Sequence, residues 1–213
     1  MKIQSFEFNM FGVNTYIIFD TATCEAAVVD PGMTAARECA RIDNYIESNG
    51  LRVKYLINTH MHIDHLFGDE YIEKKYGVGI SASTDDSILS SRIAEQARMF
   101  RLRTDMPEML KVDNPLKNGD RLMLGAEPID IIAVPGHSPG SIALYCPESK
   151  FLVTGDALFK NSIGRTDLPG GSHEQLISSI TKRLLTLPPD TTVYPGHGPS
   201  TTIESELRHN PFL

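Results

Sequence analysis

The sequence predicts a chain of α-helices and β-strands organised as two β-rich halves whose strand ends meet at one site. Three apolar runs each end in a histidine, at His60, His137 and His197, and a fourth run ends in Asp156. Ligands gather at the carboxyl ends of strands in open α/β sheets, so these side chains are expected to lie together.

A repeat links the two halves. Segments 15–30 and 141–156 have the same length, and each reads as a hairpin that ends in aspartate. Any two hairpins share an alternating pattern, so this similarity alone would be weak. The ending Pro-Gly-His, which occurs at both 135–137 and 195–197, supports the interpretation of two related halves.

The composition is that of an ordinary soluble globular protein. The 213 residues fit one large domain over residues 1–213, with two small domains as the less economical alternative. Apolar residues make up 41% and charged residues 22% of the chain. The 20 basic and 27 acidic residues give a net charge of −7, which argues against a nucleic-acid partner because such a partner requires a concentrated basic face.

The sequence also predicts a cytoplasmic location. Cys24, Cys39 and Cys146 are odd in number and lack paired spacing, which is typical of free thiols in a reducing compartment. Residues 1–20 lack the apolar core of a signal peptide, and no run approaches the length of a membrane span. We therefore expect no membrane partner, and the sequence leaves the oligomeric state open.

In the first half, short runs of β-branched and aromatic residues alternate with helical patterns. We expect strands at 14–19, 26–29 and 53–57, and helices from Thr34 to Gly50 and from about Leu66 to Tyr76. Thr34 can cap the first helix, and Gly50 ends it.

The second half starts with a polar segment, 84–110, in which we expect a helix and in which arginine and methionine cluster over 98–103. Strands are expected at about 121–124, 128–134, 141–146 and 151–154. Ser172 and Gln175 form a capping box for a further helix. A last strand ends at Tyr194, and a short helix starts near Thr201.

The densest group of polar residues is the run His60-Met61-His62-Ile63-Asp64-His65. His60 and His62 are two residues apart, so on an extended backbone their side chains point the same way and can reach one ion together. Asp64 and His65 come where the chain turns into a helix, which directs them toward a second position.

Three later residues can complete these two positions. His137 can join the first and His197 the second, while the two oxygens of Asp156 can bridge them. Nitrogen and oxygen donors without cysteine suit zinc, iron or manganese. Two ions about 3.5–4 Å apart share a hydroxide at neutral pH and clamp a carbonyl oxygen. A structural zinc site needs four ligands and usually takes cysteines, so a structural role explains seven residues poorly.

The two remaining histidines of this half receive a plainer interpretation. His173 lies in the first turn of a capped helix, and His209 lies near the end of the terminal helix. We interpret both as histidines without a role in the metal centre.

These motifs resemble those of the metallo-β-lactamase superfamily. The run 60–65, followed in order by Pro135-Gly136-His137, Gly155-Asp156 and Gly196-His197, is similar to the signature of that superfamily, and the resemblance extends from about residue 12 to residue 213. It implies an α+β fold, an αβ/βα four-layer sandwich of two mixed β-sheets flanked by helices. It also implies two divalent metal ions, with zinc as the first choice and iron or manganese as alternatives.

Within the superfamily, segments 155–159, 164–167 and 196–199 most resemble the short glyoxalase II-like hydrolases. The resemblance implies His60, His62 and His137 as ligands of one metal, Asp64, His65 and His197 as ligands of the other, and Asp156 as the bridge. Asp64 and Asp156 would thereby serve catalysis by a metal-bound hydroxide. Asp30 falls where the family keeps an aspartate that supports the ligands, and a plain turn residue is the alternative.

The chain departs from these hydrolases around the substrate. Arg165 stands where they place a basic substrate contact, and an ion pair with Asp167 is the alternative. The aromatic contact expected next is missing, with Asp167 close to its place. Full-length glyoxalase II enzymes continue into a helical extension that grips glutathione, whereas we expect none here because the sequence ends at Leu213. These departures leave the thiol carrier open.

The favoured function is hydrolysis of a small-molecule thioester such as S-acylglutathione. Attack by a metal-bound hydroxide would release a thiolate, a leaving group that needs no separate general acid. A persulfide dioxygenase with a single iron resembles the same motifs and is the first alternative, and a lactonase or β-lactamase is the second. The acidic charge opposes a nuclease, and a metal-binding module without catalysis would hydrolyse no ester.

Overall fold

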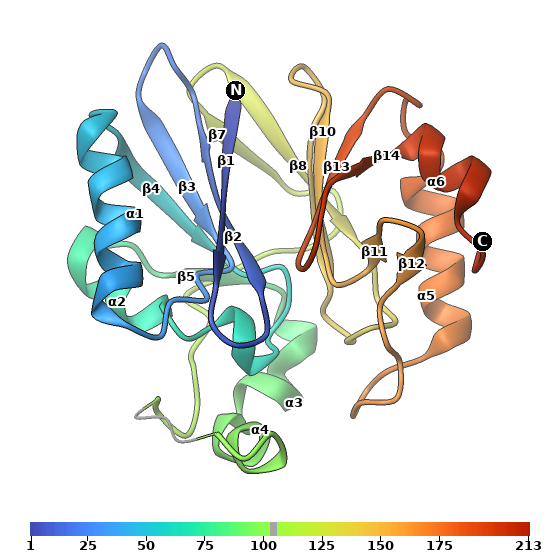
Figure 1. The fold of residues 1–213 in the computed structure, drawn as a ribbon, viewed down its shortest axis with the longest axis horizontal. Helices are drawn as coiled ribbons and strands as arrows, with labels where there is room; N and C mark the ends of the chain where they lie inside the picture. Colours follow the sequence, from blue (N-terminus) through green and yellow to red (C-terminus); the bar gives the residue numbers. More distant parts are fainter. Residues whose placement is uncertain (103–105) are drawn as a thin grey trace.

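Two six-stranded sheets pack face to face in the protein (Figure 1). The structure is a computed structural model that describes residues 1–102 and 106–213. A two-stranded hairpin, β11 (Leu158–Phe159) with β12 (Ser162–Ile163), projects beside the second sheet.

The first sheet is mixed. In the order of pairing its strands are β1 (Lys2–Phe8), β2 (Val13–Phe19), β3 (Glu25–Val29), β4 (Arg52–Ile57), β5 (Ile80–Ala82) and β6 (Asn114–Pro115). Strands β1, β2 and β3 are antiparallel neighbours, with Tyr16 opposite Val29, and β3 to β6 are parallel.

The second sheet repeats this pattern in part. In the order of pairing its strands are β14 (Thr201–Thr202), β13 (Thr192–Pro195), β10 (Phe151–Gly155), β9 (Ile142–Cys146), β8 (Glu127–Ala133) and β7 (Arg121–Leu124). Strands β10 and β13 are parallel, and the other neighbours are antiparallel.

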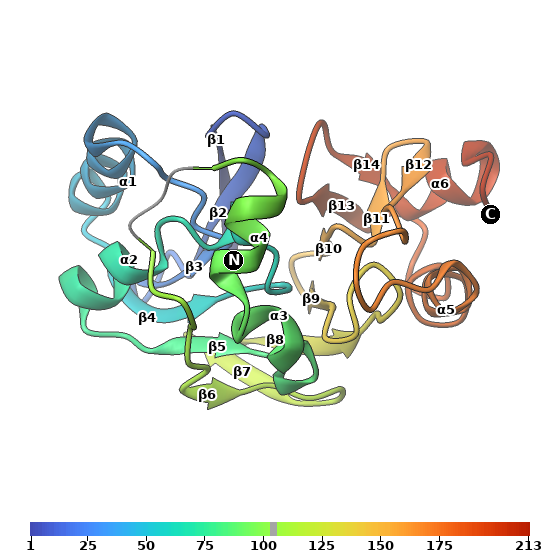
Figure 2. The same ribbon diagram turned by 90° about the horizontal axis from the view of Figure 1, so that it is seen from below.

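Helices cover the outer faces of both sheets (Figure 1). Helices α1 (Ala36–Ser48) and α2 (Asp69–Tyr76) cover the first sheet, and α5 (His173–Ser179), the π-helical turn η3 (Ile180–Leu184) and α6 (Ile203–His209) cover the second. The remaining short helices are η1 (Ile63–His65), η2 (Thr84–Asp86), α3 (Ser87–Ser90) and α4 (Ile93–Met99). Helices α3 and α4 lie together at one end of the molecule, the end that faces the viewer in the view from below (Figure 2). The α+β four-layer sandwich is confirmed.

The core forms three layers because the central strands are buried on both faces. In β2, Ile17 packs toward the helices of the first half, whereas its neighbour Ile18 packs between the sheets. In β10, Val153 packs between the sheets and Leu152 packs toward α5. Strands buried on both faces read as continuous apolar runs, which is the pattern seen in the sequence.

The longer strands and the helix capped by Ser172 are confirmed. The predicted capping box is only half formed, because Ser172 Oγ accepts from Gln175 N whereas Ser172 N donates to the Gly136 carbonyl. Two predictions about helices were wrong. Helix α1 has Ala35, not Thr34, at its N-cap, because the Glu38 carboxylate accepts from the backbone N–H of both residues, at 2.8 Å from Thr34 and 3.2 Å from Ala35. The segment 84–110 does not stay helical after Met99: residues 100–102 and 106–110 contain no helix, and 103–105 lie outside the described residues. Pro107 lacks the N–H that a helix needs.

No helix within residues 1–102 and 106–213 is long and apolar enough to cross a membrane.

Candidate metal centre

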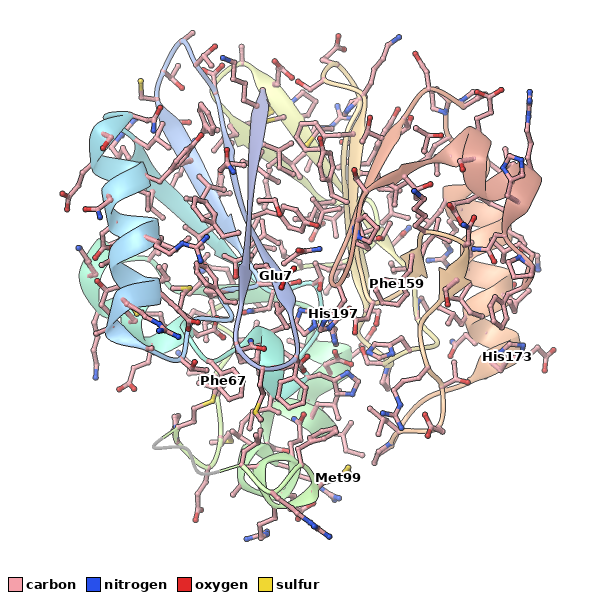
Figure 3. All side chains as sticks on the ribbon, in the orientation of Figure 1. Glu7, Phe67, Met99, Phe159, His173 and His197 are labelled. Atoms are coloured by element: carbon pink, nitrogen blue, oxygen red, sulfur yellow. The ribbon has the colours of Figure 1, made fainter. Side chains whose placement is uncertain are left out.

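The seven residues predicted as metal ligands lie together where the strand ends of both sheets meet. His60 and His62 follow β4, Asp64 and His65 belong to η1, His137 follows β8, Asp156 follows β10, and His197 follows β13. His197 is seen at the centre of the molecule, between the two halves (Figure 3). Each half therefore supplies part of the cluster.

The first group consists of His60, His62 and His137. One nitrogen of each lies within 4.8 Å of the others, and all three side chains are buried. The contact between His62 Nδ1 and His137 Nε2 is 2.8 Å. Three imidazoles turned toward a common point are a suitable set of ligands for a divalent transition metal.

The second group consists of Asp64, His65 and His197, whose donor atoms also lie within 4.8 Å of one another. Oδ2 of Asp64 is 3.4 Å from His197 Nε2 and 3.6 Å from His65 Nε2. Asp156 lies between the groups: its Oδ1 is 3.5 Å from His65 Nε2, and its Oδ2 is 3.5 Å from His197 Nε2 and 3.6 Å from His137 Nε2.

The outer ring nitrogens of four histidines are held by hydrogen bonds. Nδ1 contacts Thr59 Oγ1 for His60 (3.1 Å), Asp30 Oδ2 for His65 (3.1 Å), the Arg165 carbonyl for His137 (2.8 Å) and the Phe11 carbonyl for His197 (3.0 Å). These bonds turn Nε2 of each ring toward the interior of the cluster. Such outer contacts fix the tautomer and the orientation of metal-binding histidines.

Several atoms of the cluster are buried without a hydrogen-bond partner among residues 1–102 and 106–213, including His60 Nε2, His65 Nε2 and Asp156 Oδ1. A polar atom left unpaired in a dry interior is costly, so such atoms are normally satisfied. A divalent cation would satisfy all three. The residues present thus fit two metal ions, by donor type and by arrangement.

The charge states of the cluster suit cations. Burial and the neighbouring imidazole of His65 hold the pKa of His60 well below its ordinary value, and burial and His137 lower the pKa of His62 to about 3. Both rings are therefore neutral donors. Burial opposes ionisation of Asp156, but the facing His65 and His197 imidazoles outweigh it and hold the pKa of this carboxyl well below its usual range.

His197 shows the opposite shift. Burial opposes its protonation, but hydrogen bonds to Asp156 and Asp64 raise its pKa to about 10. In the metal-free protein, a proton on this ring therefore balances the carboxylates. Metal binding at this position would release that proton.

Asp30 supports the cluster from behind. Its buried carboxylate accepts from the backbone N–H and the hydroxyl of Thr59, both at 2.7 Å, and contacts His65 Nδ1. Its backbone has φ of 49°, in the left-handed region that non-glycine residues rarely adopt. Such strain persists where surrounding bonds determine the conformation, so Asp30 is more than a turn residue.

Three residues that the sequence analysis missed hold the loop 60–65 from outside. Asp86 accepts from Met61 N (3.0 Å), Gln96 accepts from Ile63 N (3.0 Å) and donates to the Met61 carbonyl (3.1 Å), and Asn9 donates to the Asp64 carbonyl (3.1 Å). Asp86 also accepts from Ser138 Oγ (2.8 Å) and Gly140 N (2.5 Å), just after His137. It thus ties together the two loops that carry the first group.

Two glycines of the motifs are required by close approach. A Cβ at Gly196 would lie 2.1 Å from Asp156 Oδ1, and one at Gly155 would lie 2.3 Å from Thr59 Oγ1. Gly155 also has φ of 49°. The residues that precede Asp156 and His197 must therefore lack a side chain.

An open cavity of about 510 Å³ lies against the cluster. Its floor includes His62, Asp64, His137, Asp156 and His197, and its walls include Phe11, Phe100, Phe159, Lys160 and Leu168. A cavity of this size holds a small molecule. Phe159 lies close to His197, with ring centroids 6.3 Å apart (Figure 3).

Of the other residues named in the sequence analysis, Arg165 lies at the cavity, whereas His173 and His209 lie away from it. Arg165 lines the cavity, and its guanidinium makes a bidentate ion pair with Asp167, both N–O distances being 2.7 Å. His173 lies exposed at the start of α5, at the outer edge of the second half (Figure 3). His209 is exposed at the end of α6 and contacts the Ser205 carbonyl. Neither histidine lies in the cluster.

Known proteins are similar to this chain in sequence and in fold. A family profile described as the Metallo-beta-lactamase superfamily matches residues 9–197. A relative named hydroxyacylglutathione hydrolase GloC, from Haemophilus influenzae, is 38% identical over 214 residues, covering 100% of this chain and 98% of that protein. The chain belongs to the metallo-β-lactamase superfamily.

Solved structures of other proteins have a similar fold. The crystal structure of BLEG-1 B3 metallo-beta-lactamase has a TM-score of 0.87 and 31% identity, covering 100% of this chain and 99% of that one. That of TTHA1623 in a di-iron-bound form has a TM-score of 0.86 and 33% identity, covering 99% and 100%. Membership of this superfamily and the histidine and aspartate groups together indicate that the centre binds divalent metal ions.

Proposed function

We propose that this protein is a dinuclear metal-dependent hydrolase of thioesters such as S-acylglutathione. Residues 1–213 would act as one catalytic domain in the cytoplasm, where the three free cysteines would stay reduced. The observation that carries the proposal is the pair of three-residue donor groups joined by Asp156 at the floor of an open cavity. The similarity to a relative named hydroxyacylglutathione hydrolase GloC supports the thioester as substrate.

The ligands are proposed as follows: His60, His62 and His137 for one ion, Asp64, His65 and His197 for the other, and Asp156 for both. Zinc is the first choice, and iron and manganese suit the same donors. When bound, two such ions supply Lewis acidity at a carbonyl oxygen and lower the pKa of water.

The chain's own residues would prepare this chemistry. Asp64 and Asp156 both line the cavity, where their carboxylates can orient an attacking water. Burial opposes ionisation of Asp64, but the neighbouring His65 and His197 outweigh it and lower its pKa, so the carboxylate is ready to accept a hydrogen bond at neutral pH. The departing thiolate needs no general acid, and no further acid is required in the cavity.

Arg165 is proposed as a substrate contact at the wall of the cavity. Its planar guanidinium can bind a carboxylate in a bidentate pair. The ion pair with Asp167 already occupies this geometry, so a substrate carboxylate would have to displace Asp167.

A three-substrate assay tests the proposed function. Protein depleted of metal with a chelator should be inactive, and zinc or manganese should restore hydrolysis of S-lactoylglutathione. The restored protein should hydrolyse a β-lactam far more slowly, and protein reloaded with iron should consume no oxygen with glutathione persulfide. Oxygen uptake without thioester hydrolysis would overturn the proposal in favour of a dioxygenase.

A further inference from the structure

A second cation lines the cavity, and its charge is uncompensated. Lys160 and Arg165 are the lysine and arginine among the described residues that line it. The Arg165 guanidinium is bound to Asp167, whereas the exposed Lys160 ammonium makes no hydrogen bond or ion pair within residues 1–102 and 106–213. The two cations therefore differ in what they can offer an incoming anion.

The backbone of Lys160 is held firmly although its side chain is free. Lys160 lies in the turn between β11 and β12, next to Asn161, whose φ is 56°. The backbone N–H of Asn161 donates to Glu206 of α6 at 2.9 Å, and the Asn210 amide donates to the Ser162 carbonyl at 3.0 Å. Helix α6 thus anchors the hairpin that presents the lysine.

Glu206, the acidic residue that anchors this hairpin, already accepts three hydrogen bonds. Glu206 is fully buried and accepts from Thr201 Oγ1 (2.6 Å), Asn161 N (2.9 Å) and Asn210 Nδ2 (2.8 Å). Its carboxylate is used in holding the turn and is not available to neutralise the ammonium. The hairpin therefore delivers a free positive charge to the cavity.

A free cation at this place has a clear use. The chain carries a net charge of −7, so an anionic substrate approaches a protein of like charge, and a cation on the cavity wall can attract the carboxylates that lie away from the proposed metal ions. Acylglutathione carries two carboxylates. A substrate carboxylate would have to displace Asp167 in order to bind Arg165, whereas it could bind Lys160 without displacing another carboxylate.

We propose that Lys160 selects an anionic thiol carrier by pairing with a carboxylate of the substrate, and that it contributes more to substrate affinity than Arg165 does. This inference rests on the proposed thioesterase function. It names the feature of the substrate that is recognised, a carboxylate on the thiol side of the thioester.

The test compares Lys160→Gln, Arg165→Gln and the matched control Lys182→Gln, a surface lysine of η3 remote from this cavity. The substrates are S-lactoylglutathione and its diethyl ester, which keeps the thioester but lacks both carboxylates. Lys160→Gln should raise KM for the free acid about three- to tenfold, the effect of one ion pair, with kcat kept within about twofold. Arg165→Gln should raise KM for the free acid less than Lys160→Gln does. Neither of these two variants should change KM for the diethyl ester.

Two further readouts separate recognition from structure. Raising the ionic strength should raise KM for the free acid in the parent but much less in Lys160→Gln, because salt screens an exposed pair. Lys160→Arg should restore the parental KM. An unchanged KM in Lys160→Gln, or an equal rise for acid and ester, would overturn the proposal.

Failure of the proposed function would be visible separately, as hydrolysis of neither thioester. In that case, carboxylate recognition is tested by calorimetric binding of S-hexylglutathione, a thioether that cannot be hydrolysed, to the metal-loaded protein. A Kd that rises about three- to tenfold in Lys160→Gln would support carboxylate recognition. No binding by the parent, or an equal Kd in both proteins, would overturn it.

Discussion

Among single residues, Asp30 shows how a side chain behind the cluster can orient a proposed metal ligand within it. Its Oδ2 contacts His65 Nδ1, which favours a proton on Nδ1 and leaves Nε2 as the nitrogen that would bind a metal. The same carboxylate accepts from the backbone and the hydroxyl of Thr59, beside His60. One carboxylate therefore orients residues of both donor groups.

Asp30→Asn should weaken metal binding without changing the size of the side chain. The amide oxygen would keep the bond from Thr59 N, and the NH₂ group would then face His65 Nδ1. The ring would carry its proton on Nε2, which blocks the lone pair. We expect metal affinity to fall about 10- to 100-fold, measured by competition with a coloured chelator.

Asp20→Asn is the matched control, because Asp20 accepts from the backbone and hydroxyl of Thr23 but contacts no histidine. Equal metal affinity in Asp30→Asn and the parent protein would show that Asp30 only shapes the turn.

The residues of the cluster could be predicted from sequence, whereas their supports could not. His60, His62, Asp64 and His65 stand close together in the chain and carry a recognisable spacing. Asp86, Gln96 and Asn9 are separated from that run by many residues and resemble ordinary surface polar residues. Only the fold brings their side chains to the backbone of the loop.

Among the elements, helix α4 has the clearest influence on the centre. Gln96 projects from it and is 6% exposed, and it satisfies Ile63 N together with the carbonyls of Met61 and Leu89. These contacts hold the loop between His60 and Asp64 from one side. Without the helix, this loop would expose its backbone groups.

Gln96→Leu should destabilise the protein and loosen the metal site together. The leucine fills similar space but leaves buried backbone groups unpaired, so we expect the free energy of unfolding to fall by about 2–4 kcal/mol in urea denaturation. Metal affinity should fall in parallel. Gln175→Leu is the control and should change neither quantity, because Gln175 is exposed on α5 and its side chain makes no hydrogen bond to the part of the chain that the structure describes. A stable Gln96→Leu with parental metal affinity would mean that the loop holds its own conformation.

Long elements with one strong pattern were predictable, and short ones were not. Strands β2, β9 and β10 are mostly apolar, and in β4 exposed Arg52 and Lys54 alternate with Val53 and Tyr55 before an apolar end. Strands β5, β6, β11, β12 and β14 have two or three residues each, too few to show a period. Leu110 lies beside α3, with its backbone N donating to the Ser90 carbonyl at 2.9 Å, a tertiary contact that no local pattern encodes.

In the whole molecule, the repeated hairpins of the sequence have a structural counterpart. Strands β2 and β3 form an antiparallel hairpin followed by α1 and the parallel strand β4, and β9 and β10 are followed by α5 and the parallel strand β13. Asp30 and Asp156 end corresponding strands. They contact opposite nitrogens of His65, at 3.1 Å and 3.5 Å, so the two halves meet across this one ring.

Metal removal should therefore weaken the contact between the halves. Each proposed metal takes ligands from both halves. An ion whose free concentration is about 1,000-fold above its Kd contributes about 4 kcal/mol to the free energy of unfolding. For a protein of this size, the loss of two such ions to a chelator should lower Tm by roughly 15–30 °C in a calorimetric scan. The chelator should have a smaller effect on Asp156→Asn. An unchanged Tm in protein shown to be free of metal would mean that the halves dock independently of the ions.

The most direct test of a dinuclear centre is the metal content of the parent protein and of two variants, measured by elemental analysis after loading with zinc and removal of excess. The parent should hold two ions per chain. His62→Ala should keep one, in the group with Asp64 and His197, and His65→Ala should keep one, in the group with His60 and His137. Competition with a chelator should give different affinities for the two variants. A single ion in the parent, lost equally in both variants, would contradict the account and indicate a mononuclear site.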